Sequence, residues 1–203
     1  MARISGSNGA RTATAIRSAA LTLIYRQGFA AMNLRDLAAE VGIQPSSLYN
    51  HITSKQALLF DMMQEHMATL LAATDAALEA AGPALMDRLR AFIAHHVLYH
   101  MERRQEVYIA NFELRALDPP NYRQIVEMRR NYEARLMALL EEGVATGELE
   151  VADIPVTTFA MLAMLTGICT WYRPNGRLEK AELVALHTEL ALNGVRRRAV
   201  SAR

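Results

Sequence analysis

The amino-acid sequence predicts an all-α protein, for three reasons. Of its 203 residues, 52% are hydrophobic and 21% are charged, which is the composition of an ordinary globular protein. Ala, Leu, Met, Glu and Arg dominate, and such side chains lose little rotamer freedom in a helix. Apolar residues recur at helical spacing between Gly and Pro breakers, and no stretch alternates as a β-strand does.

Three helices are expected at the start of the chain. Residues 12–27 place apolar side chains at helical spacing, and Gly28 ends this run. Asn33 is a good N-cap for a second, short helix, which Gly42 closes. Pro45 suits the first turn of a third short helix, because its missing N–H costs nothing there.

A longer helix is expected over residues 53–81. Thr53 and Gln56 form a capping-box pattern at its start, and Gly82 followed by Pro83 breaks it. Similar breakers divide the rest of the chain, and the stretches between them predict further helices over 84–101, 102–117, 121–146, 156–171 and 179–198.

Charge is unevenly distributed along a nearly neutral chain of net charge +1. The first 60 residues carry six Arg or Lys residues against two acidic ones, Asp36 and Glu40. Acidic residues gather later in the chain, as in Glu141 and Glu142. A basic front end on a neutral chain indicates a module that binds a polyanion, joined to a second part.

The chain has one cysteine, Cys169, so we expect neither an intrachain disulfide nor a zinc site built from cysteines. Residues 1–11 lack the apolar core of a signal peptide. The most apolar stretch, 159–169, is shorter than a membrane span. A cytoplasmic protein without a membrane partner is therefore expected.

Residues 28–58 contain the most informative motif. The second and third expected helices are separated only by residues 42–44, which is the spacing of a helix-turn-helix. Gly42 permits a left-handed turn. The residues that would face inward are apolar: Leu37, Ala38, Val41, Leu48 and Ile52. The third helix would present polar or aromatic hydrogen-bonding side chains, suited to base edges and phosphates: Gln44, Ser46, Ser47, Tyr49, Asn50 and His51.

This motif resembles the DNA-binding signature of the TetR family. The matching groups occur in order and without gaps: Gly28-Phe29, Leu34-Arg35-Asp36-Leu37-Ala38, Val41-Gly42-Ile43, Ser47-Leu48-Tyr49-Asn50-His51 and Lys55-Gln56-Ala57-Leu58. Ile52 departs from the family, which usually has phenylalanine there. The resemblance implies a helix-turn-helix DNA-binding domain over 1–58, followed by a larger helical ligand-binding and dimerisation domain over 59–203.

The resemblance also implies roles for individual residues on double-stranded DNA. Lys55 would bind a phosphate at the start of the fourth helix, where the helix dipole assists it. The remaining DNA-binding residues are expected to be Arg35 from the second helix, Gln44, Ser46 and Asn50 facing bases, Tyr49 and His51 on the backbone, and Pro45 and Ser47 at the start of the third helix. Alternatives stay open: the third helix could be merely solvated, Ser47 only a hydrogen bonder at a helix start, and Gln44 only a turn residue.

A homodimer is expected, because operators usually consist of two half-sites and a dimer matches that symmetry. In the TetR family the last two helices pair with those of a second chain. Two sets of residues would form the contact: Ala160, Ala163, Met164 and Gly167 on one helix, and Leu183, Leu186, Leu190 and Val195 on the other. The alternative is that these residues belong to the core of a single chain.

A pocket for a small hydrophobic effector is expected among the middle helices. Its candidate lining is aromatic and rich in Met, which suits apolar or flexible ligands: Phe92, His96, Tyr99, His100, Tyr108, Phe112, Met128, Tyr132 and Met161. Such residues at helical spacing more often form a core, so fewer than half are expected to touch a ligand.

Residues 170–178, with the sequence TWYRPNGRL, are similar to a segment in TetR-type regulators of fatty-acid and sterol breakdown. Those regulators respond to acyl-CoA thioesters, so acyl-CoA is one candidate class of effector. Arg173 and Arg177 could pair with the phosphates of CoA. The alternative is a capped turn in which Trp171 anchors the last two helices.

No enzyme and no cofactor are predicted. The chain lacks a glycine-rich phosphate loop, and Cys169 lies in an apolar stretch where a thiol is usually inert. His96 and His100 are four residues apart, but no metal-binding pattern surrounds them. The sequence therefore predicts a transcriptional regulator, most simply a repressor that an effector releases from DNA. The alternative is a DNA-binding dimer without a small-molecule inducer.

Overall fold

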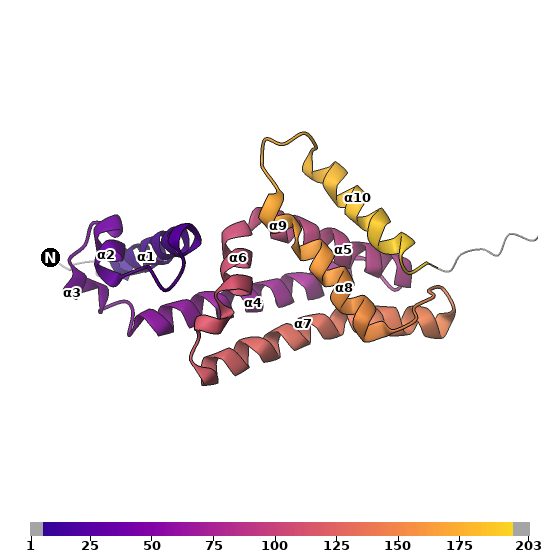
Figure 1. The fold of residues 1–203 in the computed structure, drawn as a ribbon, viewed down its shortest axis with the longest axis horizontal. Helices are drawn as coiled ribbons and strands as arrows, with labels where there is room; N and C mark the ends of the chain where they lie inside the picture. Colours follow the sequence, from indigo (N-terminus) through magenta and orange to yellow (C-terminus); the bar gives the residue numbers. More distant parts are fainter. Residues whose placement is uncertain (1–5, 197–203) are drawn as a thin grey trace, which may run out of the picture. The chain divides into compact units, whose positions relative to one another are not determined.

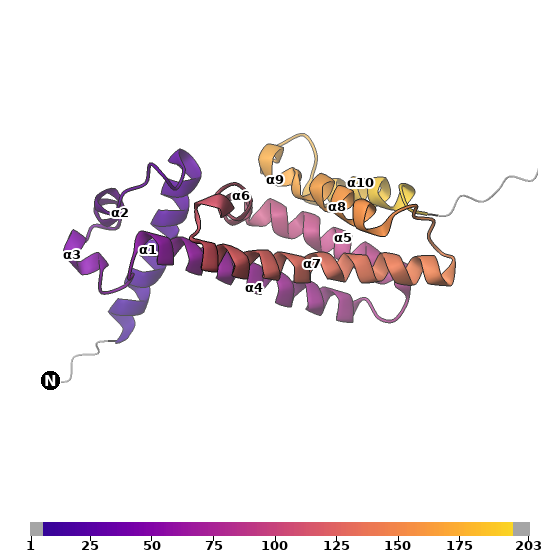
Figure 2. The ribbon, with the colours of Figure 1, turned by 60° about the horizontal axis from the view of Figure 1, so that its bottom comes forward.

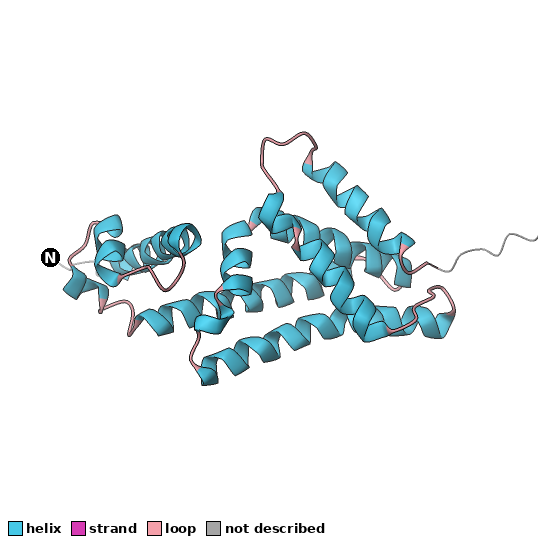
Figure 3. Cartoon of the chain, viewed as in Figure 1, coloured by secondary structure: helices cyan, strands magenta, loops and turns pink. Residues whose placement is uncertain are grey.

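The computed structural model describes residues 6–196, and the ordered segments in this range are helical (Figure 3). Within that range it contains no β-strand, and an isolated antiparallel bridge joins Leu149 to Arg196. The chain divides into two compact units. Unit 1 consists of Met1–Met67 and Gln105–Val126, and unit 2 consists of Ala68–Arg104 and Glu127–Arg203. The predicted all-α fold class is confirmed.

Unit 1 contains three helices that precede the long helix α4 (Lys55–Ala80) (Figure 1). They are α1 (Gly6–Gln27), α2 (Leu34–Val41) and α3 (Pro45–Leu48). Helix α2 contacts both α1 and α3, and Leu37 and Leu48 are fully buried in this packing. The later chain adds most of α6 (Arg104–Phe112) and the 3-10 helix η1 (Leu114–Ala116) to the same unit.

Unit 2 is a bundle in which α5 (Leu85–Glu102) is the central helix. Helix α5 contacts α8 (Ile154–Thr166), α9 (Ile168–Trp171) and α10 (Lys180–Asn193) (Figure 2). The members of this bundle are the later parts of α4 and α7 (Pro119–Thr146), with α5, α8, α9 and α10. The core around α5 is apolar, and Leu89, Phe92, Ile93 and Val97 have no exposed surface.

Two predicted helices are each divided in the structure. The range 102–117 contains α6 and η1 in place of one helix, because the backbone leaves helical geometry at Glu113 (φ −100°, ψ 4°). The range 156–171 contains α8 and α9, and Gly167 caps the first of them. Glycine has a low helix propensity, so an interruption at Gly167 costs little.

Several helix ends also differ from the predicted ones. Helix α1 begins at Gly6, and α7 begins at Pro119, where both prolines occupy the first turn that tolerates them. Helix α4 begins at Lys55, and the cap is Ser54, whose Oγ accepts the N–H of Ala57 at 2.9 Å. The predicted cap at Thr53 is therefore wrong by one residue. Helix α10 ends at Asn193, and the predicted continuation beyond residue 196 lies outside the described residues.

Candidate DNA-binding surface and effector site

The turn between α2 and α3 is fixed at both ends by its own sequence. Asn33 Oδ1 accepts the N–H groups of Arg35 at 3.0 Å and Asp36 at 2.9 Å, which confirms the predicted N-cap. At the other end Gly42 has φ 72°, a left-handed conformation that side chains disfavour. The next N–H, of Ile43, donates to Ala38 O at 3.0 Å. The backbone is therefore turned sharply before α3 begins at Pro45.

Helix α3 is a single turn, and the residues after it continue as hydrogen-bonded turns. The N–H groups of His51 and Ile52 both donate to Leu48 O, at 2.9 and 3.1 Å. Leu48 is fully buried. The buried Leu48 side chain thus anchors α3, and the exposed side chains around it are available to a partner.

The structure places most predicted DNA-binding residues on the surface of unit 1. Tyr49 is 59% exposed, which is unusual for a large aromatic residue that no partner covers. Seven of the nine predicted residues are exposed, namely Arg35, Gln44, Pro45, Ser46, Tyr49, Asn50 and His51, and the other two, Ser47 and Lys55, are half-buried.

Lys55 is held by the turn between α1 and α2. Its Nζ donates to Ala30 O at 3.3 Å and lies 4.3 Å from the centre of the Phe29 ring. Desolvation lowers the pKa of Lys55, and the Glu113 carboxylate opposes that shift. Sequence reasoning identified Lys55 but not Glu113, which lies 58 residues later in the chain.

In unit 2, three of the predicted effector residues, Phe92, His100 and Tyr132, meet around a fourth, His96. Phe92, His96 and Tyr132 have ring centres 5.5 to 6.3 Å apart and are almost fully buried. The Nδ1 of His96 is 2.7 Å from Tyr132 Oη, and its Nε2 is 3.1 Å from Thr166 Oγ1. This group, with Thr74 and His100 described below, is here called the His96 cluster.

Burial keeps the His96 cluster neutral. Desolvation lowers the pKa of His100 to about 4 and that of His96 well below its ordinary value. It also raises the pKa of Tyr132. The rings of His96 and His100 stack with centres 3.7 Å apart, an arrangement that two imidazolium cations would oppose. The cluster can therefore donate or accept hydrogen bonds without carrying charge.

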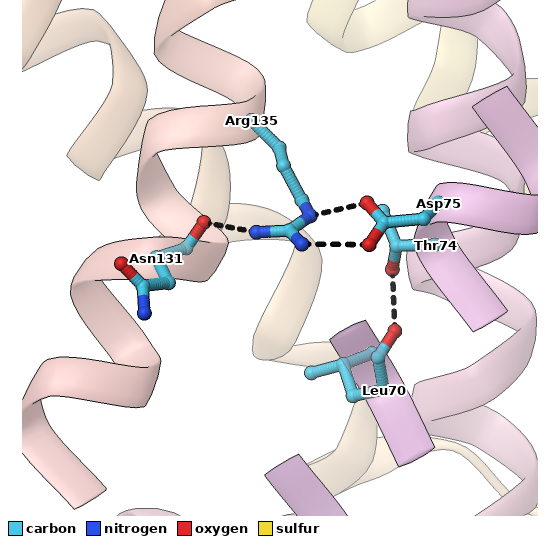
Figure 4. Close-up of polar contacts among 5 residues, drawn as sticks. All are labelled: Leu70, Thr74, Asp75, Asn131 and Arg135. Atoms are coloured by element: carbon cyan, nitrogen blue, oxygen red, sulfur yellow. Dashed lines mark hydrogen bonds and ion pairs between the residues drawn. The ribbon is translucent and has the colours of Figure 1, made fainter. Parts of the chain in front are cut away.

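The cluster extends to a pair of residues on α4 that sequence reasoning missed (Figure 4). Thr74 is fully buried, donates to Leu70 O at 2.7 Å and faces Tyr132. Beside it, Asp75 accepts from Arg135 Nε at 2.5 Å and from Arg135 Nη2 at 2.7 Å. This fork-to-fork pair joins α4 to α7 within unit 2. Partners 60 residues apart leave no signal in a single sequence.

Of the other predicted effector residues, Tyr99 borders the His96 cluster, with its ring centre 6.0 Å from that of His100. Tyr108 and Phe112 belong to unit 1, where Tyr108 packs edge-on against Tyr25 with ring centres 5.0 Å apart. Tyr99 and Met161 are buried in unit 2, and Met128 is half-buried there. The structure thus separates the predicted aromatic lining into two groups.

Arg173 and Arg177 line a surface hollow of about 230 Å³ together with Trp171, Tyr172, Gly176, Leu178 and Leu183. Trp171 is 52% exposed and stacks on His187 with ring centres 5.9 Å apart. The lining includes no ring of the His96 cluster. The hollow is therefore separate from the His96 cluster.

Helices α8 and α10 expose a run of large apolar side chains. Val156 and Phe159 on α8 are 64% and 52% exposed, and Leu186 and Leu190 on α10 are 51% and 62% exposed. Ala160, Ala163 and Met164 are also exposed. By contrast, Leu183 and Val195 are buried within the chain, so those two residues cannot belong to a contact face as the sequence suggested.

The segment Ile154–Trp171 is long and apolar enough to cross a membrane, and 28% of it is buried. The apolar stretch predicted from the sequence, residues 159–169, covers only part of this segment. It coincides with the exposed apolar run of α8, so a protein partner and a membrane are both compatible with its composition alone.

Among the described residues no group of three or more His, Cys, Asp or Glu could hold a metal ion. Burial raises the pKa of the Cys169 thiol, which disfavours the reactive thiolate.

Comparisons with known proteins agree with this architecture. Residues 16–62 match the profile of the tetR family of bacterial regulatory proteins, and residues 82–195 match a tetracyclin repressor-like C-terminal domain. The chain is 25% identical over 179 residues to the HTH-type transcriptional repressor KstR2 of Mycolicibacterium smegmatis, covering 87% of this chain and 86% of that protein.

Two solved structures are similar over nearly the whole chain. A tetR-family regulatory protein from Rhodococcus RHA1 has a TM-score of 0.83 at 26% identity, covering 93% of this chain and 98% of that one. AibR in complex with isovaleryl coenzyme A and operator DNA has a TM-score of 0.80 at 25% identity, covering 88% and 97%. The chain therefore belongs to the tetR family of bacterial regulatory proteins, which are DNA-binding regulators and not enzymes.

Proposed function

We propose that this protein is a cytoplasmic transcriptional repressor that binds operator DNA as a homodimer and is released by a small hydrophobic effector. The observation that carries the proposal is the exposed surface of α3 and its following turn, set by the Asn33 and Gly42 caps and anchored by buried Leu48. A one-turn helix offers few base contacts, so phosphates should supply much of the affinity. The relatives named as repressors support the direction of regulation.

The exposed apolar run on α8 and α10 supports the homodimer. Both helices pack on α5, and an isolated chain rarely leaves several large apolar side chains of such helices in water. A second copy would cover them by a two-fold contact in which the same patch is used on both chains. The repeated helix-turn-helix motifs would then be spaced for two half-sites, about 34 Å apart along the DNA.

Two features of unit 2 support an effector. The His96 cluster offers neutral polar groups in an aromatic setting, which suits the polar end of a largely apolar ligand. The Arg173 and Arg177 hollow offers two guanidinium groups and an exposed indole, which suit phosphates and a stacked base.

Acyl-CoA thioesters are the effector class that uses both features. The hollow of about 230 Å³ is smaller than the roughly 300–1,000 Å³ of typical ligand pockets, so it would hold only part of a CoA ester. The similarity to AibR, solved with isovaleryl coenzyme A, supports this class. The tight packing around His96 favours the second candidate, a DNA-binding dimer that has no inducer.

The proposed mechanism has two states. The effector would bind unit 2, where α4 ends, and alter the course of α4, which begins in unit 1 at Lys55. The distance between the two DNA-binding units of the dimer would then no longer match that between the two half-sites. The coupling required is modest, on the order of 1–3 kcal/mol.

Thermal unfolding with a panel of acyl-CoAs, free CoA, free fatty acids and planar hydrophobic drugs tests the effector. A ligand at a hundred times its Kd should stabilise the fold by roughly 2.7 kcal/mol. A shift with one CoA ester and none with free CoA supports the acyl-CoA class. No shift with any CoA ester removes that class and leaves the DNA-binding proposal intact.

A further inference from the structure

Glu113 lies outside the helix-turn-helix motif in sequence but contacts it within unit 1. Its Oε1 accepts the backbone N–H of Phe29 at 3.2 Å, across 84 residues of sequence. Phe29 is buried and follows Gly28, whose left-handed φ of 82° turns the chain from α1 toward α2. The carboxylate therefore caps the turn that connects the first two helices.

The same turn holds Lys55. The Nζ of Lys55 lies over the Phe29 ring and donates to Ala30 O, while Glu113 Oε1 accepts the backbone N–H of Phe29. Both charged groups therefore contact residues 29 and 30 of one turn, and the Glu113 carboxylate acts to raise the pKa of Lys55 against the lowering by desolvation. A negative charge is thus fixed beside a lysine that the proposed function assigns to a DNA phosphate.

Two further contacts keep this carboxylate in position. Gln56 Nε2 donates to Ala116 O at 2.7 Å, and Tyr108 packs edge-on against Tyr25. Both contacts join the segment 105–117 to the helices of the DNA-binding motif. Glu113 is therefore presented by a fixed backbone, in contrast to a charge on a freely moving surface side chain.

We propose that Glu113 is a positioning residue for DNA binding, whose carboxylate competes with an operator phosphate for Lys55 and so sets the affinity below what the motif alone would give. The inference rests on the proposed function, in which Lys55 binds a phosphate. A carboxylate near the phosphate repels it and attracts the lysine away from it, and both effects weaken the complex. The segment 105–117 thereby determines the affinity of a motif to which it does not belong.

The test is a double-mutant cycle of Glu113→Gln and Lys55→Ala, measured as the Kd for two fluorescent duplexes. One duplex is selected by the wild-type chain from a random library, and the other is of mixed sequence. Glu113→Gln keeps an oxygen that can accept the Phe29 N–H and removes only the charge. Asp61→Asn, at an exposed position of α4 in the same unit, is the control for a change of one unit in net charge.

We expect Glu113→Gln to lower the Kd about three- to tenfold in the wild-type background and less than twofold in the Lys55→Ala background. The gain should be similar on both duplexes, because a phosphate contact carries no sequence information. Asp61→Asn should change the Kd less than twofold.

An equal gain in both backgrounds, or no gain in the wild type, overturns the inference. Should Glu113→Gln fail to fold, Glu113→Asp keeps an accepting carboxylate but moves its charge by one methylene, and its effect on Kd must likewise depend on Lys55. Wild-type chain that selects no duplex contradicts the proposed function itself, a result distinct from a cycle that shows no coupling.

Discussion

Asn33 and Gly42 carry much of the local specification of the DNA-binding motif. The amide oxygen of Asn33 satisfies two N–H groups that open α2, and Gly42 supplies the left-handed residue that closes it. These are two effects of single residues on backbone geometry, and neither depends on a distant contact. Both positions were therefore predictable from sequence.

Asn33→Ala is expected to destabilise the fold, because it removes the cap that accepts two N–H groups. The expected loss in the free energy of unfolding is about 1 kcal/mol, and operator affinity should fall as α2 frays. Urea denaturation measures the change. Asn33→Ser, which keeps an accepting oxygen and brings no charge beside Asp36, should cost less than half as much, and equal losses for both variants would contradict the role of the cap.

The His96 cluster makes a prediction about pH. The pKa of His100 is about 4 in the folded chain and its ordinary value is 6.5. Between these pH values His100 is therefore protonated in the unfolded chain and neutral in the folded chain. The free energy of unfolding should therefore fall as the pH drops from 6.5 toward 4, by up to about 1.4 kcal/mol per pH unit for each such histidine. His96 shifts in the same direction and adds to the slope.

Urea denaturation at several pH values measures this slope. His100→Asn keeps a nitrogen for the contact with His96 O at 2.7 Å and removes the titrating group. Its stability should depend less on pH than that of the wild type. His51→Gln, at an exposed position, serves as the control. An unchanged slope in His100→Asn would contradict the neutral, buried state of that histidine.

At the scale of elements, helices α8 and α10 show what helical periodicity can and cannot specify. The period identifies an apolar face but not whether that face is covered by the same chain or by another. Leu183 and Leu186 are only three residues apart, yet the first is buried and the second is exposed. The packing of α10 on α5 decides between them, and that contact is not visible in one sequence.

Phe159→Glu is expected to break the homodimer, because it would bury a carboxylate in the proposed contact. The dimer dissociation constant should rise about a hundredfold or more, which corresponds to the few kcal/mol that an unpaired buried charge costs. Analytical ultracentrifugation measures it. Ala134→Glu, at an exposed site on α7, should leave the dimer intact. A Phe159→Glu variant that remains dimeric would place the interface elsewhere.

The helices themselves were largely predictable, because caps and breakers are local. Helix α5 matches its expected range to within one residue at each end. The division of 102–117 into α6 and η1 was not predictable, because no Gly or Pro marks it. In unit 1, this segment contacts the first helices through Glu113, which accepts from Phe29, and Tyr108, which packs on Tyr25. Each contact joins residues more than 80 positions apart in the sequence.

At the scale of the whole molecule, the proposed DNA-binding surface is encoded in one continuous segment and the proposed effector site is not. The His96 cluster draws Thr74, His96, Tyr132 and Thr166 from four helices. Aromatic residues at helical spacing could not show that Tyr108 and Phe112 would join unit 1. For the same reason, their role in binding an effector stays a prediction.

Replacement of both Arg173 and Arg177 by Ala tests the acyl-CoA proposal in the complete chain. The double variant should keep its operator affinity and lose most of the thermal stabilisation by a CoA ester, because the guanidinium partners of the phosphates are gone. Arg123→Ala, which removes an exposed arginine of unit 1, is the control for stabilisation. Equal stabilisation of the double variant and the wild type would remove these two residues from the effector site.

The most direct test of the central claim is a titration of a selected operator duplex with the purified chain, followed by fluorescence anisotropy with the stoichiometry determined by light scattering. The account predicts two chains per duplex and a Kd that weakens steeply with salt, because Lys55 and the residues around α3 replace counterions on phosphates. It also predicts that Tyr49→Ala, which alters an exposed side chain of that surface, weakens binding without altering stability. A complex containing one chain, or no preference for any duplex over mixed sequence, would contradict the assignment as a dimeric repressor.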